Sequence, residues 1–188
     1  MLENDYRIYV DLEYCYPGMT PEKGRPNEKE QRQVVQISAI LFDNTTGREI
    51  ACFDVITKPA FETKLPTFFI ELTNITDDQV AKNGVSFPKA LDEFIQFVQD
   101  YPIWTFNADW GVLKQNCQYF NIPFKYEETP FIRVRPLLAQ WNINADNYSS
   151  GTLYQAAGLD MQGHVHNALH DVRSMAHAVH VFERRLKD

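Results

Sequence analysis

The chain has 188 residues, of which 44% are hydrophobic and 23% charged, and its formal net charge is −7. The length suits one globular domain with a substantial core, so we expect residues 1–188 to form a single domain. The negative charge argues against a protein that wraps nucleic acid through bulk electrostatics, although it does not exclude an enzyme that holds a few nucleotides in a local groove.

The composition also bears on the compartment. No apolar run reaches the ~20 residues of a membrane span, and the acidic start lacks the basic and apolar regions of a signal peptide. Cys15, Cys52 and Cys117 are odd in number and widely spaced, which fits neither a disulfide framework nor a zinc pattern. The sequence therefore predicts a cytoplasmic protein with no membrane partner.

The first expected element is a β-strand over residues 9–14, in which polar and aliphatic side chains alternate. Successive strand residues point to opposite faces, so Asp11 and Glu13 share one face and lie about 6–7 Å apart. Two such carboxylates repel each other and resist burial, and a divalent cation between them is a natural partner. A solvent-facing edge strand is the alternative, and this stretch alone does not decide between them.

A polar segment with several Gly, Pro and charged residues follows at 17–32, and we expect an exposed loop there. The apolar, β-branched run at 34–42 predicts the second strand, and 49–58 the third. The turn residues at 43–47 make these two strands a hairpin.

Helical periodicity dominates the rest of the chain. Thr76 opens a capping box for a short helix that ends near Gly84, and Ser86 precedes a second helix that reaches Val98. The remaining expected elements are strands at 103–106 and 131–134 and helices at 110–120, 136–141, 152–157 and 168–186. The predicted class is α/β, with a mixed five-stranded sheet of three antiparallel strands followed by parallel crossovers, flanked by helices.

Three further polar residues occur where such a fold gathers ligands. Asp171 lies beside the apolar stripe of the last helix, between Ala168 and Met175, and should face the sheet, where a carboxylate needs a partner. His166 is five residues earlier, about 140° away around a helix, so it must lie on the loop entering that helix if both serve one site. Asp109 follows the fourth strand, and ligands of open α/β sheets bind at the carboxyl ends of strands.

Together these segments resemble the three exonuclease motifs of the DEDDh 3′-to-5′ exonucleases, a superfamily with a ribonuclease-H-like fold. The motif segments are Asp11-Leu12-Glu13, Asp109 and His166-Asn167-Ala168-Leu169-His170-Asp171. Residues 64–76, 104–117 and 133–139 are similar to the histone-mRNA 3′-exonuclease branch, the first of them around its Leu-Thr-Gly-Ile signature.

The chain departs from the family pattern at three positions. Asn74 stands where the family usually has Gly, and Asn tolerates a positive φ better than most residues, so the turn there can persist. Asn167 and His170 replace a common Arg and a common Asp. Neither of the last two is a core catalytic position in the family.

The resemblance implies the site and its chemistry. Asp11, Glu13, Asp109 and Asp171 would bind two divalent ions, Mg²⁺ or Mn²⁺, that promote an in-line displacement at phosphorus. His166 would act as the general base that takes the proton of the attacking water. The substrates would be single-stranded 3′ ends of RNA or DNA, and the products nucleoside 5′-monophosphates.

Substrate contacts can be suggested from the same segments. Phe68 is a candidate to stack on the terminal base, with core packing as its alternative, and Tyr14 and Thr73 flank the same expected pocket. Four cations are candidates for phosphate contacts or are simply solvated charges: Lys64, Arg133, Arg135 and Arg173.

The sequence favours a metal-dependent exoribonuclease, and three alternatives remain. A DNA-directed 3′-to-5′ exonuclease of the proofreading or repair type would use the same residues. A non-catalytic nucleic-acid-binding module on a degenerate nuclease fold would be expected to lose a carboxylate or the histidine, and none is lost here. His166 and His170 have the i, i+4 spacing of zinc ligands, but no Cys or third His nearby completes a tetrahedral set.

Overall fold

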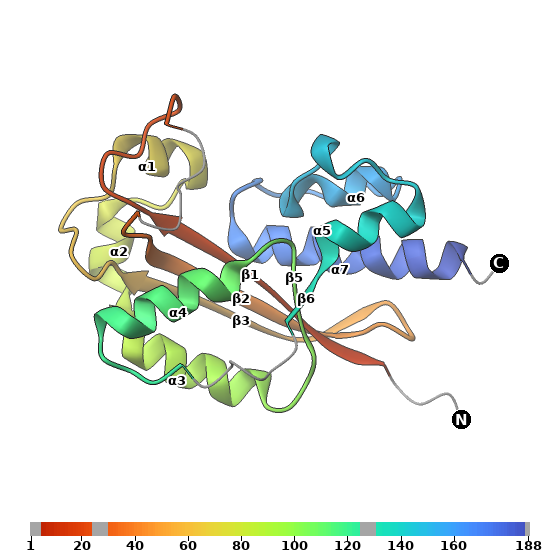
Figure 1. Cartoon of the computed structure of the whole chain (residues 1–188), viewed down its shortest axis with the longest axis horizontal. Helices are drawn as coiled ribbons and strands as arrows, with labels where there is room; N and C mark the ends of the chain where they lie inside the picture. Colours follow the sequence, from red (N-terminus) through yellow and green to blue (C-terminus); the bar gives the residue numbers. More distant parts are fainter. Residues whose placement is uncertain (1–4, 24–29, 125–130, 187–188) are drawn as a thin grey trace.

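A computed structural model describes residues 5–23, 30–124 and 131–186 of the chain. The strands form one sheet in the order β4-β3-β2-β1-β5-β6, and helices cover both of its faces (Figure 1). β1 pairs antiparallel with β2, and β2 with β3, whereas β5 and β6 run parallel to β1, so the predicted mixed sheet is confirmed. The strands are β1 (Tyr6–Cys15), β2 (Gln33–Asp43), β3 (Arg48–Lys58), β4 (Val85–Ser86), β5 (Ile103–Thr105) and β6 (Phe131–Arg133).

The expected count of five strands is wrong by one. The additional strand, β4, consists of Val85 and Ser86 and pairs in parallel with Thr57 and Lys58 at the end of β3. Two residues cannot display the period-two alternation that predicts a strand, and here they also lie directly before a helix.

β1 occupies the interior of the sheet between β2 and β5. Val10 and Leu12 face a hydrophobic cluster with helices α3 (Phe87–Val98) and α4 (Asp109–Tyr119), whereas Tyr9 faces a second cluster formed with helix α7 (Ala168–Arg185). Asp11 and Glu13 follow Tyr9 by two and four residues, so their side chains point to the same face of the sheet as Tyr9. Only 7% and 8% of their surfaces are exposed. The solvent-facing edge strand considered from the sequence is therefore excluded.

The expected helices are present with small shifts at their ends. The capping box is formed: the hydroxyl oxygen of Thr76 accepts from the backbone N–H of Gln79 at 3.2 Å, and the side chain of Gln79 accepts from the N–H of Thr76 at 2.8 Å. These helices are α2 (Asp77–Asn83), α3 (Phe87–Val98), α4 (Asp109–Tyr119), α5 (Val134–Leu137), α6 (Leu153–Ala156) and α7 (Ala168–Arg185), with 3₁₀ turns at Leu138–Trp141, Ala145–Asn147 and Ser150–Thr152.

Helix α1 (Thr67–Thr73) was not expected from the sequence. Only Phe69 and Thr73 of its seven residues are buried, so its sequence carries no extended apolar repeat. The helix ends at Asn74, which has φ +60° and donates its backbone N–H to the carbonyl of Ile70 at 2.8 Å. Asn74 thus adopts the left-handed conformation for which the family usually has Gly, as expected.

The described parts of the predicted loop 17–32 differ in exposure. Residues 17, 18 and 20–23 are exposed, whereas Arg32 is half-buried; residues 24–29 lie outside the described part of the chain. The side chain of Asn116 in α4 donates to the carbonyl of Arg32 at 2.9 Å and accepts from the N–H of Val34 at 3.1 Å. The end of this segment is therefore fixed against α4.

Within the described residues, none of the helices combines the length and apolarity needed to cross a bilayer.

A buried glutamine fixes the start of α7 over the sheet. The side chain of Gln36, in the middle of β2, accepts from the N–H of Ala168 at 3.1 Å and donates to Asp54 at 2.8 Å. The first turn of α7 carries Asp171, so this contact helps to set the position of that carboxylate relative to β1.

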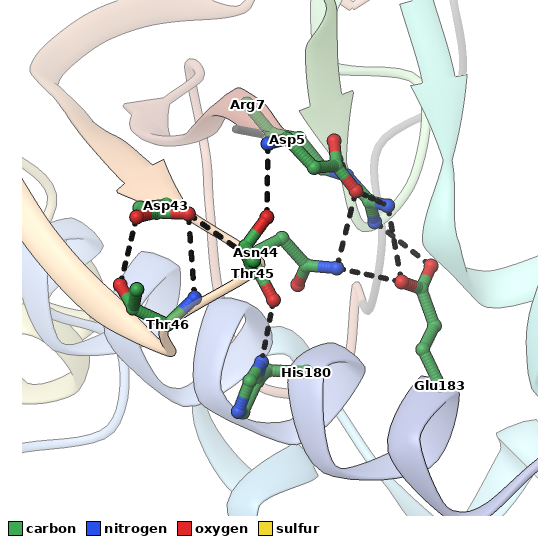
Figure 2. A network of polar contacts seen from close by, with 8 residues as sticks. All are labelled: Asp5, Arg7, Asp43, Asn44, Thr45, Thr46, His180 and Glu183. Carbon is green, nitrogen blue, oxygen red and sulfur yellow. Dashed lines mark hydrogen bonds and ion pairs between the residues drawn. The ribbon is translucent and has the colours of Figure 1, made fainter. Parts of the chain in front are cut away.

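A polar network at the far end of α7 ties the helix to the start of β1 and to the β2–β3 turn (Figure 2). Arg7 donates to both carboxylate oxygens of Glu183, at 2.8 and 3.0 Å, and also pairs with Asp5. Asn44 donates to Glu183 at 2.6 Å, and its carbonyl contacts a ring nitrogen of His180 at 2.9 Å. Glu183 is the shared acceptor of this network.

We expect Glu183→Ala to lower the free energy of unfolding by about 2 kcal/mol, because Arg7 and Asn44 lose a charged acceptor while remaining largely buried. Urea denaturation followed by circular dichroism measures the change. Glu93→Ala is the control, since it removes an exposed pair with Lys89 that should contribute at most about 0.5 kcal/mol. Equal losses in the two variants would contradict the prediction.

Candidate active site

One cleft of about 500 Å³ brings together all five residues predicted for catalysis. β1 supplies Asp11 and Glu13, α4 begins with Asp109, α7 carries Asp171, and the loop before α7 carries His166. The starts of α4 and α7 lie beside the later part of β1 (Figure 1), and residues of these elements line the cleft. The site therefore forms at the carboxyl ends of neighbouring strands.

Asp171 is the most deeply buried of the four carboxylates, with 2% of its surface exposed. It accepts hydrogen bonds from the hydroxyl of Ser150 at 3.1 Å and from the backbone N–H of His166 at 3.2 Å. Burial raises the pKa of Asp171 to about 7, and the two hydrogen bonds offset only part of that rise.

The two carboxylates of β1 also have raised pKa values. Burial raises the pKa of Asp11 well above its usual value, and repulsion from Asp171, Asp109 and Glu13 adds to the rise, whereas a hydrogen bond from Ser150 opposes it. Burial, followed by repulsion from Asp171 and Asp109, likewise raises the pKa of Glu13. Negative charge is thus concentrated where little water can screen it.

His166 has a backbone conformation that is unusual for a residue other than glycine. Its φ is +69°, in the left-handed region, and such conformations persist where the surrounding structure imposes them. One donor atom from each of His166, Glu13 and Asp171 lies within 4.8 Å of the other two. The loop before α7 thus places the imidazole of His166 beside Glu13 and Asp171. This is the position that the sequence analysis required if His166 and Asp171 belong to one site.

The donor set fits divalent metal ions. Four carboxylates converge in one cleft, and the raised pKa values of Asp11, Glu13 and Asp171 indicate that a counter-charge would be favourable there. Hard divalent cations prefer carboxylate oxygens. Asp109 is half-buried at the start of α4 and is close enough to raise the pKa values of both β1 carboxylates.

The 3₁₀ turn at Ser150–Thr152 forms a wall behind Asp171, and sequence reasoning missed it. A Cβ atom on Gly151 would lie only 2.3 Å from a carboxylate oxygen of Asp171, so a side chain there would displace the carboxylate. Ser149 and Ser150 line the cleft. No family motif or periodicity marks this turn, and the only local signal is a Ser-Ser-Gly-Thr run typical of any turn.

His170 supports the same turn. Its side chain is buried, and one ring nitrogen contacts the carbonyl of Gly151 at 3.1 Å. Among the described residues, the group of potential metal ligands contains Glu13, His166 and Asp171 but not His170, so nothing there matches the zinc pattern of the i, i+4 histidines.

The predicted substrate residues lie in different environments. Tyr14 and Phe68 line the cleft and are half-buried. Thr73 is 2% exposed and does not line it; its hydroxyl donates to the carbonyl of Phe69 at 2.8 Å and accepts from the N–H of Ile75 at 3.1 Å. Direct contact of Thr73 with substrate would require movement of α1.

Helix α1 is also joined to the loop that carries His166. A ring nitrogen of the exposed His164 contacts the carbonyl of Leu72 in α1 at 2.9 Å. Leu72 and Phe68 form the α1 side of the cleft. One wall of the cleft and the histidine loop are therefore connected directly.

Comparison with known proteins agrees with this geometry. The sequence model of the family RNase_T, described as exonuclease, matches residues 10–179. The chain belongs to this exonuclease family. The match includes all five of the cleft residues predicted for catalysis.

Individual relatives are distant. The chain is similar to 3′-5′ exoribonuclease 1 of Rattus norvegicus, with 24% identity over 184 residues that cover 92% of this chain and 51% of that protein. It is also similar to the PolC-type DNA polymerase III of Streptococcus pneumoniae serotype 2, with 27% identity over 142 residues that cover 76% of this chain and 9% of the polymerase. The chain thus spans about half the length of the exoribonuclease.

Among solved structures, the chain is similar to the nuclease domain of 3′hExo, a DEDDh family member, bound to rAMP. The TM-score is 0.80 with 22% identity, and the alignment covers 100% of this chain and 94% of that one. The comparison confirms the expected ribonuclease-H-like fold.

The raised pKa values predict how the metal-free protein responds to pH. Well below pH 4 the carboxyls are protonated in both the folded and the unfolded chain and impose no penalty. As pH rises, the unfolded chain loses its protons first, so stability in EDTA should fall until Asp171 ionises in the folded state near pH 7.

We therefore expect Asp171→Asn to raise the free energy of unfolding at pH 8 in EDTA, by on the order of 2–4 kcal/mol, and to change it little at pH 4. Urea denaturation at the two pH values measures this. Asp92→Asn, a change at an exposed position of α3, is the control for loss of a carboxylate. A variant that is less stable than the wild type at pH 8 would contradict the prediction.

Proposed function

We propose that residues 1–188 form one metal-dependent 3′-to-5′ exoribonuclease domain that hydrolyses single-stranded 3′ ends to nucleoside 5′-monophosphates. The convergence of four carboxylates and one histidine in a single cleft carries this proposal. The complete set of five also favours catalysis over a purely binding role. The free cysteines, Cys15, Cys52 and Cys117, support a reducing, cytoplasmic location.

The carboxylates provide the metal ligands. Asp11, Glu13 and Asp171 would hold one divalent ion, and Asp11 and Asp109 would hold a second. Mg²⁺ and Mn²⁺ both suit such oxygen ligands. When bound, the two ions stabilise the attacking and leaving oxygens of an in-line displacement.

The remaining residues act on the attacking water and on the terminal nucleobase. His166 takes the proton of the attacking water, a common role of imidazole near neutral pH. Its backbone N–H donates to Asp171, so the general base and a metal ligand are held together. Phe68 and Tyr14 offer aromatic surfaces to the terminal nucleotide, where stacking is tolerant of base identity.

Similarity to an exoribonuclease across 92% of the chain favours RNA as the substrate. A DNA-directed 3′-to-5′ exonuclease is the second candidate, because the chain is also similar to part of a DNA polymerase. The two differ in whether the ribose 2′-hydroxyl is recognised.

We expect a 5′-labelled single-stranded RNA 12-mer to be shortened from its 3′ end with Mg²⁺ or Mn²⁺ and to remain intact with EDTA. The same sequence as DNA, digested in parallel, distinguishes the two candidates by the ratio of rates. Asp11→Asn should reduce cleavage to background while keeping the wild-type circular dichroism spectrum, and Asp92→Asn should remain active. Cleavage in EDTA, or full activity of Asp11→Asn, would overturn the metal assignment.

The role of His166 can be separated from metal binding. Asn tolerates a positive φ better than Ala, so His166→Asn preserves the turn better while removing the base. We expect at least a ~100-fold loss in kcat, together with a rise in melting temperature on addition of Mn²⁺ as large as that of the wild type. If the rise is lost, His166 is a metal ligand and not the base.

A further inference from the structure

Arg32 is the one lysine or arginine among the described residues that line the cleft. All four carboxylates of the site line the same cleft. A nucleic-acid strand carries a phosphate at every nucleotide, and each phosphate that is bound without a nearby cation meets repulsion from this site. Divalent ions at the carboxylates can neutralise the scissile phosphate, but a neighbouring phosphate needs another partner.

The position of Arg32 indicates which phosphate it meets. Glu13 is opposite Gln36 in the β1–β2 pair, and Cys15 is opposite Gln33. Arg32 precedes Gln36 by four residues, which corresponds to roughly 13 Å along the strand at about 3.3 Å per residue. Arg32 also lines the cleft, so its backbone borders the cleft at a point displaced along the chain from Gln36, the residue opposite Glu13.

Arg32 is also held in place before any ligand binds. Its Nε donates to the side chain of Gln115 in α4 at 3.0 Å, and Gln115 in turn donates to the carbonyl of Glu30 at 2.9 Å. The side chain of Asn116 fixes the carbonyl of Arg32. The bond to Gln115 occupies one of the five N–H donors of the guanidinium, whose planar fork suits phosphate oxygens.

The cations suggested by the sequence are placed elsewhere. Arg173 forms two hydrogen bonds with Glu49, Arg135 pairs with Asp146, and Arg133 lies over the ring of Trp110. Lys64 lines an adjoining groove beside α1, which shares Met19, Pro21 and Phe68 with the cleft. None of these four lines the carboxylate cleft.

We propose that Arg32 binds the phosphate on the 5′ side of the scissile phosphodiester and thereby makes the enzyme favour substrates longer than two nucleotides. The proposal rests on the proposed function, because it assumes that the strand lies in this cleft. Gln115 is the positioning residue that holds the guanidinium toward that phosphate.

Substrate length separates this role from a general structural effect. A dinucleotide with a free 5′-hydroxyl contains only the scissile phosphate, whereas a hexanucleotide also carries the phosphates upstream of it. We expect Arg32→Gln to raise KM for the hexanucleotide about tenfold with little change in kcat, and to leave both constants unchanged for the dinucleotide. Equal losses on both substrates, or no loss on either, would overturn the proposal.

Binding tests the same contact without hydrolysis. Fluorescence anisotropy of a labelled RNA hexamer in Ca²⁺ gives the dissociation constant as a function of salt. Loss of one phosphate contact should reduce the slope of log K against log salt by about 0.7 for a single strand. Arg32→Lys should keep the slope, and Arg184→Gln, at an exposed position near the C-terminal end of α7, should match the wild type.

Three further outcomes are informative. If Arg32→Gln does not fold, Gln115→Ala is the second variant, because it keeps the charge of Arg32 and removes the side chain that holds the guanidinium. Gln115→Ala should raise KM for the hexanucleotide but not for the dinucleotide. An unchanged KM for both substrates would overturn the proposal. A wild type that binds RNA with an Arg32-dependent salt slope but hydrolyses nothing would refute the proposed function and support the phosphate contact. A wild type that does not bind the hexamer would overturn both.

Discussion

Repulsion among buried carboxylates is the constraint on which the rest of this structure depends. Asp11, Glu13 and Asp171 are each at most 8% exposed and carry raised pKa values, so the metal-free fold bears an unfavourable concentration of charge. The surrounding structure must therefore be stable enough to hold them together. Hydrophobic clusters on both faces of the sheet provide that stability, and β1, which presents two of the carboxylates, lies between two partner strands.

The carboxylates are positioned by contacts that have no chemical role of their own. Gln36 fixes the start of α7 over β2, so the carboxylate of Asp171 faces those of β1. Gly151 allows the backbone of the adjacent turn to pack directly against Asp171, and the ring of His170 supports that turn from behind. His170 stands where the family that the sequence resembles commonly has Asp.

The sequence predicted those parts of the molecule whose pattern repeats or whose motif is shared. The alternation in β1 and the apolar stripe of α7 predicted both elements, and the motif residues predicted the five side chains that the fold brings into one cleft. β4 and α1 were missed because a two-residue strand and a helix with two buried residues carry no period. Ser150 and Arg32 were missed because their roles arise from pairings across the fold, and nothing in the neighbouring sequence marks them.

The bond between His164 and Leu72 has a consequence for the dynamics of the cleft. Helix α1 buries only Phe69 and Thr73 of its seven residues, so we expect it to open at a lower free-energy cost than the central strands. Because the bond joins α1 to the loop that carries His166, opening of the helix also loosens that loop. Mild heating would then inactivate the protein reversibly while most of its amide hydrogens remain protected from exchange.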